Sequence, residues 1–175
     1  MKALILIVIT TWLYGCESVP DQLNPFSPDA LLSETEYSAQ RQQALERALV
    51  VDPDSGATRF VGDTVYVIMS DFQFDPNQIR LKAGAITRIR LSNSAWVTHY
   101  FGGDEFFQNG AEVVSILGSN VPPNQNHIPV PPFTERDLYL YAKDPGEYPL
   151  NCFVPNHRNA GMKGVLIVET DEKAE

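Results

Sequence analysis

The sequence is short of cysteine, histidine and basic residues. Its 175 residues include two Cys and three His, and 13 Lys and Arg stand against 22 Asp and Glu. So few thiols exclude a disulfide scaffold, and iron–sulfur clusters need more cysteines than the chain has. The net charge of −9 excludes nucleic acid as a partner, because such a chain cannot neutralise a row of phosphates. An acidic surface instead fits solubility and attraction to a basic partner.

Long hydrophobic runs are also missing. The apolar run of residues 3–12 is too short to span a bilayer as a mature helix, but it suits the core of a signal peptide. It ends in Leu13-Tyr14-Gly15-Cys16, which resembles the lipobox of bacterial lipoproteins. That resemblance implies a signal peptide over residues 1–16 and a lipid on Cys16. The alternative is an ordinary cleaved signal in which the cysteine stands by chance.

Export follows from both alternatives. We therefore expect the protein on the periplasmic side of a bacterial membrane, held there by the lipid on Cys16. Glu17 follows the cysteine where the usual inner-membrane retention residue would be Asp, so the outer membrane is slightly favoured. In an oxidising compartment the single remaining thiol, Cys152, calls for an explanation such as a metal or a reactive role.

The rest of the chain is expected to divide at residue 59. Residues 17–28 carry three prolines and predict an extended tether. A helix is predicted next, beginning at Ser27-Pro28 and ending before Asp52, with either a stalk or a packing role. Residues 60–171 are expected to form one domain. Hydrophobic residues make up 43% of the whole chain, which is enough for a globular core.

Within this domain the hydrophobic pattern changes to the alternation of β-strands. Strands are predicted around residues 65–74, 79–81, 89–91, 138–141, 148–152 and 165–168, with turns at 82–84 and 144–146. Residues 113–117 are a further candidate strand. The stretch VPPNQNHIPVPP, residues 121–132, has five prolines and predicts a loop. Short strands at this spacing indicate an all-β class and an antiparallel β-sandwich.

A cluster of rare residues stands near the end of the domain, in CFVPNHRNAGMKG. Cys152, His157 and Met162 are five residues apart on a predicted loop between two strands. A lone cysteine or methionine is usually core packing, as we expect for Met69, but three such donors together outweigh that explanation. His99, at the end of another strand, is the best candidate for a fourth donor. Two imidazoles, a thiolate and a thioether are the ligand set of a trigonal copper site with a weak axial methionine.

Residues 65–101 together with PGEYPLNCFVPNHRNAGMKGVLIVE resemble the cupredoxins, the small type 1 copper proteins. The ligand spacing is similar to that of auracyanin and rusticyanin. The resemblance implies a Greek-key cupredoxin β-sandwich and one type 1 copper ion. It also implies His99, Cys152 and His157 as equatorial ligands and Met162 as the axial ligand.

Two positions depart from the family pattern. Asn156 stands where many cupredoxins have glycine, and asparagine is the residue that best replaces glycine at a positive φ. Tyr100 stands where Asn or Ser often ties the histidine strand to the cysteine loop, so the hydrogen bonds around the ligands must differ here, and the colour of the site with them.

The function expected from these residues is one-electron transfer with a redox protein such as a cytochrome or a terminal oxidase or reductase. The exposed edge of His157 would carry the electron, with Trp96, Val154 and Pro155 as an apolar docking rim. The alternative is copper delivery or resistance without a carrier role, although the Met and His clusters usual for it are missing. An enzyme would need a second set of copper ligands.

Two further polar residues are weaker candidates for the site. His127 lies in the proline-rich stretch and is expected at the surface, where it could assist a partner or a second metal. Glu105 could approach the metal from the side of His99, but a solvated or capping role is favoured.

Overall fold

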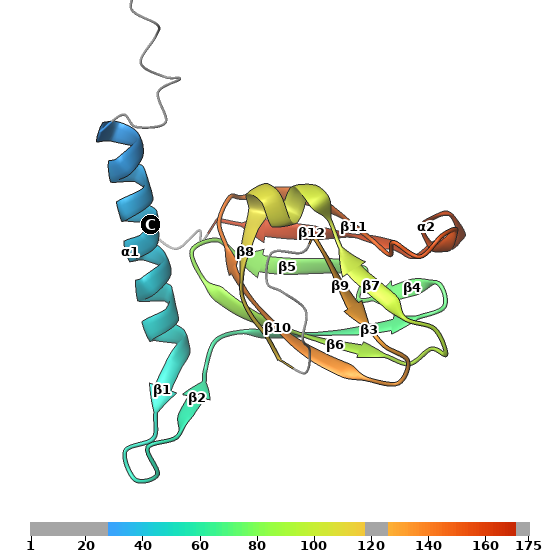
Figure 1. The fold of residues 1–175 in the computed structure, drawn as a ribbon, viewed down its shortest axis with the longest axis horizontal. Helices are drawn as coiled ribbons and strands as arrows, with labels where there is room; N and C mark the ends of the chain where they lie inside the picture. Colours follow the sequence, from blue (N-terminus) through green and yellow to red (C-terminus); the bar gives the residue numbers. More distant parts are fainter. Residues whose placement is uncertain (1–27, 118–125, 171–175) are drawn as a thin grey trace, which may run out of the picture. The chain divides into compact units, whose positions relative to one another are not determined.

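The computed structural model describes residues 28–117 and 126–170 (Figure 1). The predicted signal peptide, Cys16 and the tether lie outside these residues, and the predicted boundary at residue 59 stays a prediction. The chain forms two compact units, residues 1–36 and 37–175, and the description below concerns the second. No helix among the described residues is long and apolar enough to cross a membrane.

Two five-stranded sheets make up the body of the second unit, as Figure 1 shows. In spatial order, the first sheet contains β4 (Gln73–Asp75), β3 (Thr64–Ser70), β6 (Ile86–Asn93), β10 (Glu135–Ala142) and β8 (Ala111–Leu117). The second contains β5 (Gln78–Lys82), β12 (Lys163–Glu169), β11 (Gly146–Asn151), β7 (His99–Gly102) and β9 (His127–Val130). The predicted all-β sandwich is therefore confirmed.

Strand direction differs from the prediction in two places. β3 pairs with β6, and β12 with β5, in parallel, whereas the other pairs of both sheets are antiparallel. Alternation of apolar residues shows which face of a strand is buried but not the direction of its neighbour. The sandwich is consequently mixed rather than purely antiparallel.

The core lies between the sheets and is made by the inward faces of the strands. Alternate residues of β5 and β6 are buried, in agreement with the period-2 pattern of the sequence. Met69, Leu91, Leu138, Leu140 and Leu166 are each 0% exposed. Met69 thus has the packing role that the sequence predicted.

Two local predictions were wrong. The proline-rich stretch contains the strand β9, which tolerates Pro129 because it forms the edge of its sheet. The strand predicted around residues 65–74 is interrupted, because a turn at Asp71 and Phe72 separates β3 from β4; Phe72 is 44% exposed and Phe74 is 3% exposed.

The predicted helix is present as α1 (Pro28–Ala48), and a small hairpin follows it, made of β1 (Leu49–Val51) and β2 (Thr58–Phe60). Within the second unit, Ala44 and Ala48 of this helix are buried with Ile86 and Tyr141. This part of the helix therefore packs on the sandwich.

A polar contact fixes the same part of the helix. Tyr37 donates a 2.7 Å hydrogen bond to Glu112 of β8, and Arg41 Nε lies 2.9 Å from the other carboxylate oxygen. Burial, followed by this hydrogen bond, raises the pKa of Tyr37, so the phenol stays protonated and keeps donating.

Leu140, a core residue of β10, gives a test of the fold. Leu140→Ala should lower the free energy of unfolding by about 2–5 kcal/mol, because it removes a side chain packed between the sheets. Denaturant unfolding measures the change. The matched control is Leu117→Ala at a 52% exposed position of β8, which should change stability by less than about 0.5 kcal/mol. Equal effects of the two substitutions would contradict the described core.

Candidate metal centre

The loop between β11 and β12 carries three of the predicted ligands. Cys152 directly follows β11, His157 begins the single turn α2 (His157–Ala160), and Met162 directly precedes β12. The Cys152 N–H donates to the Met162 carbonyl at 3.2 Å, and the Met162 N–H donates to the His157 carbonyl at 2.9 Å. These bonds close the loop on itself, so the sandwich fixes the positions of all three residues.

Two residues with positive φ allow this tight loop. Asn156 has φ 69° and Gly161 has φ 120°. As predicted, Asn156 stands in place of the family's glycine at a position of positive φ, because asparagine takes the left-handed conformation at small cost.

His99 reaches the site from the neighbouring strand. It is the first residue of β7, which pairs with β11 at Gly102 and Asn151, one residue before Cys152. The loop before it is held by the buried Asn93, whose amide donates 2.8 Å bonds to the carbonyls of Val97 and Val130. The side chain of His99 is 0% exposed, so its ring is completely buried.

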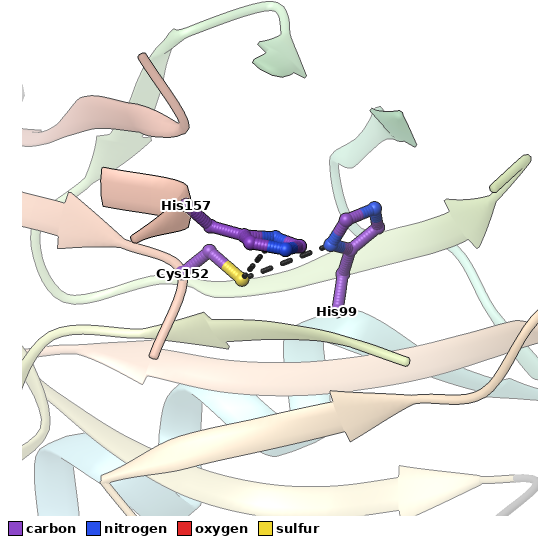
Figure 2. Close-up of side chains that lie close together, drawn as sticks. All are labelled: His99, Cys152 and His157. Atoms are coloured by element: carbon purple, nitrogen blue, oxygen red, sulfur yellow. Dashed lines mark hydrogen bonds between the residues drawn. The ribbon is translucent and has the colours of Figure 1, made fainter. Parts of the chain in front are cut away.

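The three polar donors converge around one point, as Figure 2 shows. Cys152 Sγ lies 3.8 Å from Nδ1 of His99 and 3.8 Å from Nδ1 of His157. All three ligand atoms lie within 4.8 Å of one another. A single ion placed between them could bind one sulfur and two ring nitrogens without large movements of the backbone.

Electrostatics favour the metal-binding forms of these side chains. Burial lowers the pKa of His99, which keeps the imidazole neutral and its nitrogen free to bind a metal. The backbone N–H of Tyr100 donates a hydrogen bond to Cys152 Sγ at 3.5 Å. A backbone amide thus makes the tie between the histidine strand and the cysteine, while the Tyr100 ring packs against His127 with centroids 5.7 Å apart.

Met162 is the fourth of the predicted ligands. Its side chain is 0% exposed and stands at the closing end of the loop that holds Cys152 and His157. The set of His99, Cys152, His157 and Met162 is typical of a type 1 copper site, because a thiolate, two imidazoles and a thioether suit copper better than zinc.

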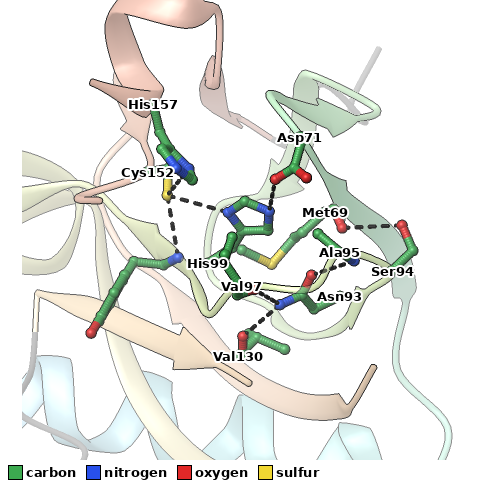
Figure 3. Close-up of polar contacts among 11 residues, drawn as sticks. Met69, Asp71, Asn93, Ser94, Ala95, Val97, His99, Val130, Cys152 and His157 are labelled. Carbon is green, nitrogen blue, oxygen red and sulfur yellow. Dashed lines mark hydrogen bonds and ion pairs between the residues drawn. The ribbon is translucent and has the colours of Figure 1, made fainter. Parts of the chain in front are cut away.

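Two residues at the site gave no signal in the sequence. The turn between β3 and β4 places Asp71 Oδ1 3.2 Å from His99 Nε2, a contact drawn in Figure 3. The adjacent Phe72 packs edge-on against the His157 ring, with centroids 4.9 Å apart. An acidic residue followed by an aromatic one at the end of a strand is too common a pattern to indicate a metal site.

Two of the three predicted rim residues line the same pocket. Val154 and Pro155 line a shallow pocket of about 490 Å³ together with Thr98, Tyr100, His127 and Phe153. Trp96 is 83% exposed and packs against Phe133, with ring centroids 4.8 Å apart. Their role in docking stays a prediction.

His127 and Glu105 lie outside the cluster of metal donors. His127 reaches the surface at the pocket lined by Val154 and is half-buried there, because its ring packs against Phe153 with centroids 4.9 Å apart. Glu105 is exposed, as predicted, and precedes the short π-helix η2 (Phe106–Gly110) without capping it through its side chain.

The comparisons with known proteins rest on structure alone, since the sequence matches no protein-family model and no curated protein. A multicopper oxidase structure matches with a TM-score of 0.50 at 16% identity, over 63% of this chain and 46% of that chain. The multicopper oxidase of Campylobacter jejuni matches at 0.49 and 17% identity, over 66% of this chain and 31% of that chain. The structure of auracyanin B matches with a TM-score of 0.45 at 20% identity, over 63% of this chain and 92% of that chain.

The first of these matches shows a shared fold. The fold is a cupredoxin-like β-sandwich. The predicted fold class is thus confirmed by both the two-sheet architecture and the structural likeness. The chain spans less than half the length of each oxidase chain that it matches.

The left-handed conformation of Asn156 in the ligand loop can be tested without a metal. Asn156→Gly should leave the stability of the protein nearly unchanged, whereas Asn156→Ala should lower it by about 1 kcal/mol, because alanine resists a positive φ. Denaturant unfolding of the metal-free protein measures both. Asn159→Ala, at an exposed position of α2, is the control for loss of the amide and should have little effect. Equal stability of Asn156→Ala and Asn156→Gly would contradict the described loop.

Proposed function

We propose that this protein is a one-electron carrier with one type 1 copper ion held by His99, Cys152, His157 and Met162. The observation that carries the proposal is the convergence of one thiol and two imidazole nitrogens within 4.8 Å, on elements that backbone hydrogen bonds already fix. Copper, when bound, supplies the Cu(II)/Cu(I) couple. A carrier needs such a site because side chains that hardly move lose little energy when an electron arrives.

The chain's own residues divide the work between the interior and the surface. His99 and Cys152 are 0% and 2% exposed and hold the inner side of the site away from water. His157 is half-buried and lies on the loop, so the outer edge of its ring offers the route for the electron. Phe72 packs on that ring and limits the access of water to it.

The place and the partner belong to the same proposal. A lipid on Cys16 would hold the protein on the periplasmic side of a bacterial membrane, with the outer membrane favoured. The partner would be a redox protein such as a cytochrome or a terminal oxidase or reductase. The apolar residues beside the site and the net charge of −9 support a partner with a matching apolar patch and a basic rim.

An oxidase activity is less well supported, although multicopper oxidases share the fold. The chain has three histidines, and two of them stand in this site. A second set of copper ligands would need more histidines than the one that remains.

Spectroscopy of the copper-loaded protein tests the proposal. One equivalent of Cu(II) should produce an intense thiolate-to-copper absorption band and narrow copper hyperfine splitting, because the metal binds Cys152. Cys152→Ala should abolish both signals. His127→Ala removes the histidine outside the cluster and should leave them unchanged. A pale spectrum that Cys152→Ala does not alter would contradict the carrier and favour copper delivery.

The docking rim can be tested by electron exchange with a small cytochrome. Val154→Glu should slow the second-order rate by about tenfold or more, because it places a charge in the apolar contact. The absorption spectrum should stay the same. Val51→Glu, at a 62% exposed position of the remote hairpin, is the matched control. A rate for Val154→Glu equal to that of the control would exclude this rim.

A further inference from the structure

The buried nitrogen of His99 faces a carboxylate. Among the described residues, His99 Nε2 has no hydrogen-bond partner of good geometry, although it is inaccessible to water. The polar atom that faces it is Asp71 Oδ1 at 3.2 Å, a close contact whose geometry falls short of an ideal hydrogen bond. The Asp71 side chain is 47% exposed, so water still solvates the outer side of its charge.

The elements that carry the two residues are tied together. Asp71 directly follows β3, and the Met69 carbonyl of that strand accepts the Ser94 N–H at 2.9 Å and the Ser94 hydroxyl at 3.3 Å. Ser94 belongs to the loop that leads to His99, and Asn93 fixes the same loop by accepting the Ala95 N–H at 2.9 Å. Figure 3 shows this network beneath the imidazole. The contact between Asp71 and His99 is therefore built into the fold.

A carboxylate at this position selects one form of the imidazole. Since Oδ1 of an ionised carboxylate is an acceptor, Nε2 facing it must carry the ring proton. Nδ1 is then the unprotonated nitrogen, and Nδ1 is the atom that faces Cys152 Sγ. A carboxylate behind a ligating histidine also raises the basicity of that ligand.

We propose that Asp71 is a positioning residue that holds His99 in the Nε2–H form and stabilises the oxidised over the reduced state of the centre. Its negative charge favours the more positive ion, so it lowers the reduction potential. The first half of this inference, the tautomer of His99, concerns the metal-free protein alone. The second half, the effect on the oxidised and reduced states, rests on the proposed function.

NMR of the metal-free protein tests the first half. Long-range ¹⁵N couplings of His99 should show the Nε2–H form in the wild type. Asp71→Asn keeps a neutral acceptor oxygen and should preserve that form, whereas Asp71→Ala should give a mixture with Nδ1–H. An Nδ1–H form in the wild type, or no change in Asp71→Ala, would overturn the proposal.

Electrochemistry of the copper-loaded protein tests the second half. Asp71→Asn should lower the ratio of Cu(II) to Cu(I) affinity by about tenfold, which raises the potential of a one-electron couple by about 59 mV. Asp75→Asn removes the same charge from an exposed position on the adjacent strand and should change the ratio by less than about twofold, because water and salt screen it. Equal potentials for the two variants would overturn the role of Asp71.

The two tests separate failure of this inference from failure of the proposed function. A wild-type protein without a thiolate-to-copper band would contradict the carrier, and the ¹⁵N couplings would still decide whether Asp71 sets the His99 tautomer. A normal band together with an unresponsive potential would contradict the role of Asp71 alone.

Discussion

The closed loop between β11 and β12 is the constraint on which the site depends. Its ends are joined by the hydrogen bond from the Cys152 N–H to the Met162 carbonyl, and both ends continue into paired strands of one sheet. Three donors therefore occupy an 11-residue segment whose backbone has little freedom. The fourth donor, His99, is added by the neighbouring strand β7. The backbone thus holds the candidate ligands in place by itself, and a fixed ligand set is what the proposed one-electron exchange requires.

A second set of contacts holds the inner side of the site. The end of β3 belongs to the opposite sheet, and it is bonded to the loop before His99 through Ser94. The turn that follows β3 then contacts both imidazoles, with Asp71 on one and Phe72 on the other. The two sheets thus meet at the metal centre, and packing of the core and placement of the ligands depend on the same strands. A substitution that loosens β3 should therefore affect both stability and the site.

Much of this arrangement follows from local sequence signals. Alternation predicted most strands, and the spacing of Cys152, His157 and Met162 placed three donors on one loop because that spacing is a property of the chain itself. Contacts between distant segments left no such signal. The parallel pairing of β3 with β6, the contact of Asp71 with His99 and the partial burial of His127 each arise from how strands meet in space. Pro129 even opposed the correct assignment of β9, since an edge strand cannot be distinguished from a loop by its prolines alone.

X-ray absorption at the copper edge, recorded on the oxidised and then the reduced protein, tests the central claim most directly. The account predicts one short sulfur and two nitrogen neighbours in both states, with little change in distance between them, because the loop and β7 fix the donors. A shell of nitrogen and oxygen without sulfur would contradict the proposed ligands. A shell that gains or loses a neighbour on reduction would contradict a preformed site and, with it, the role of a one-electron carrier.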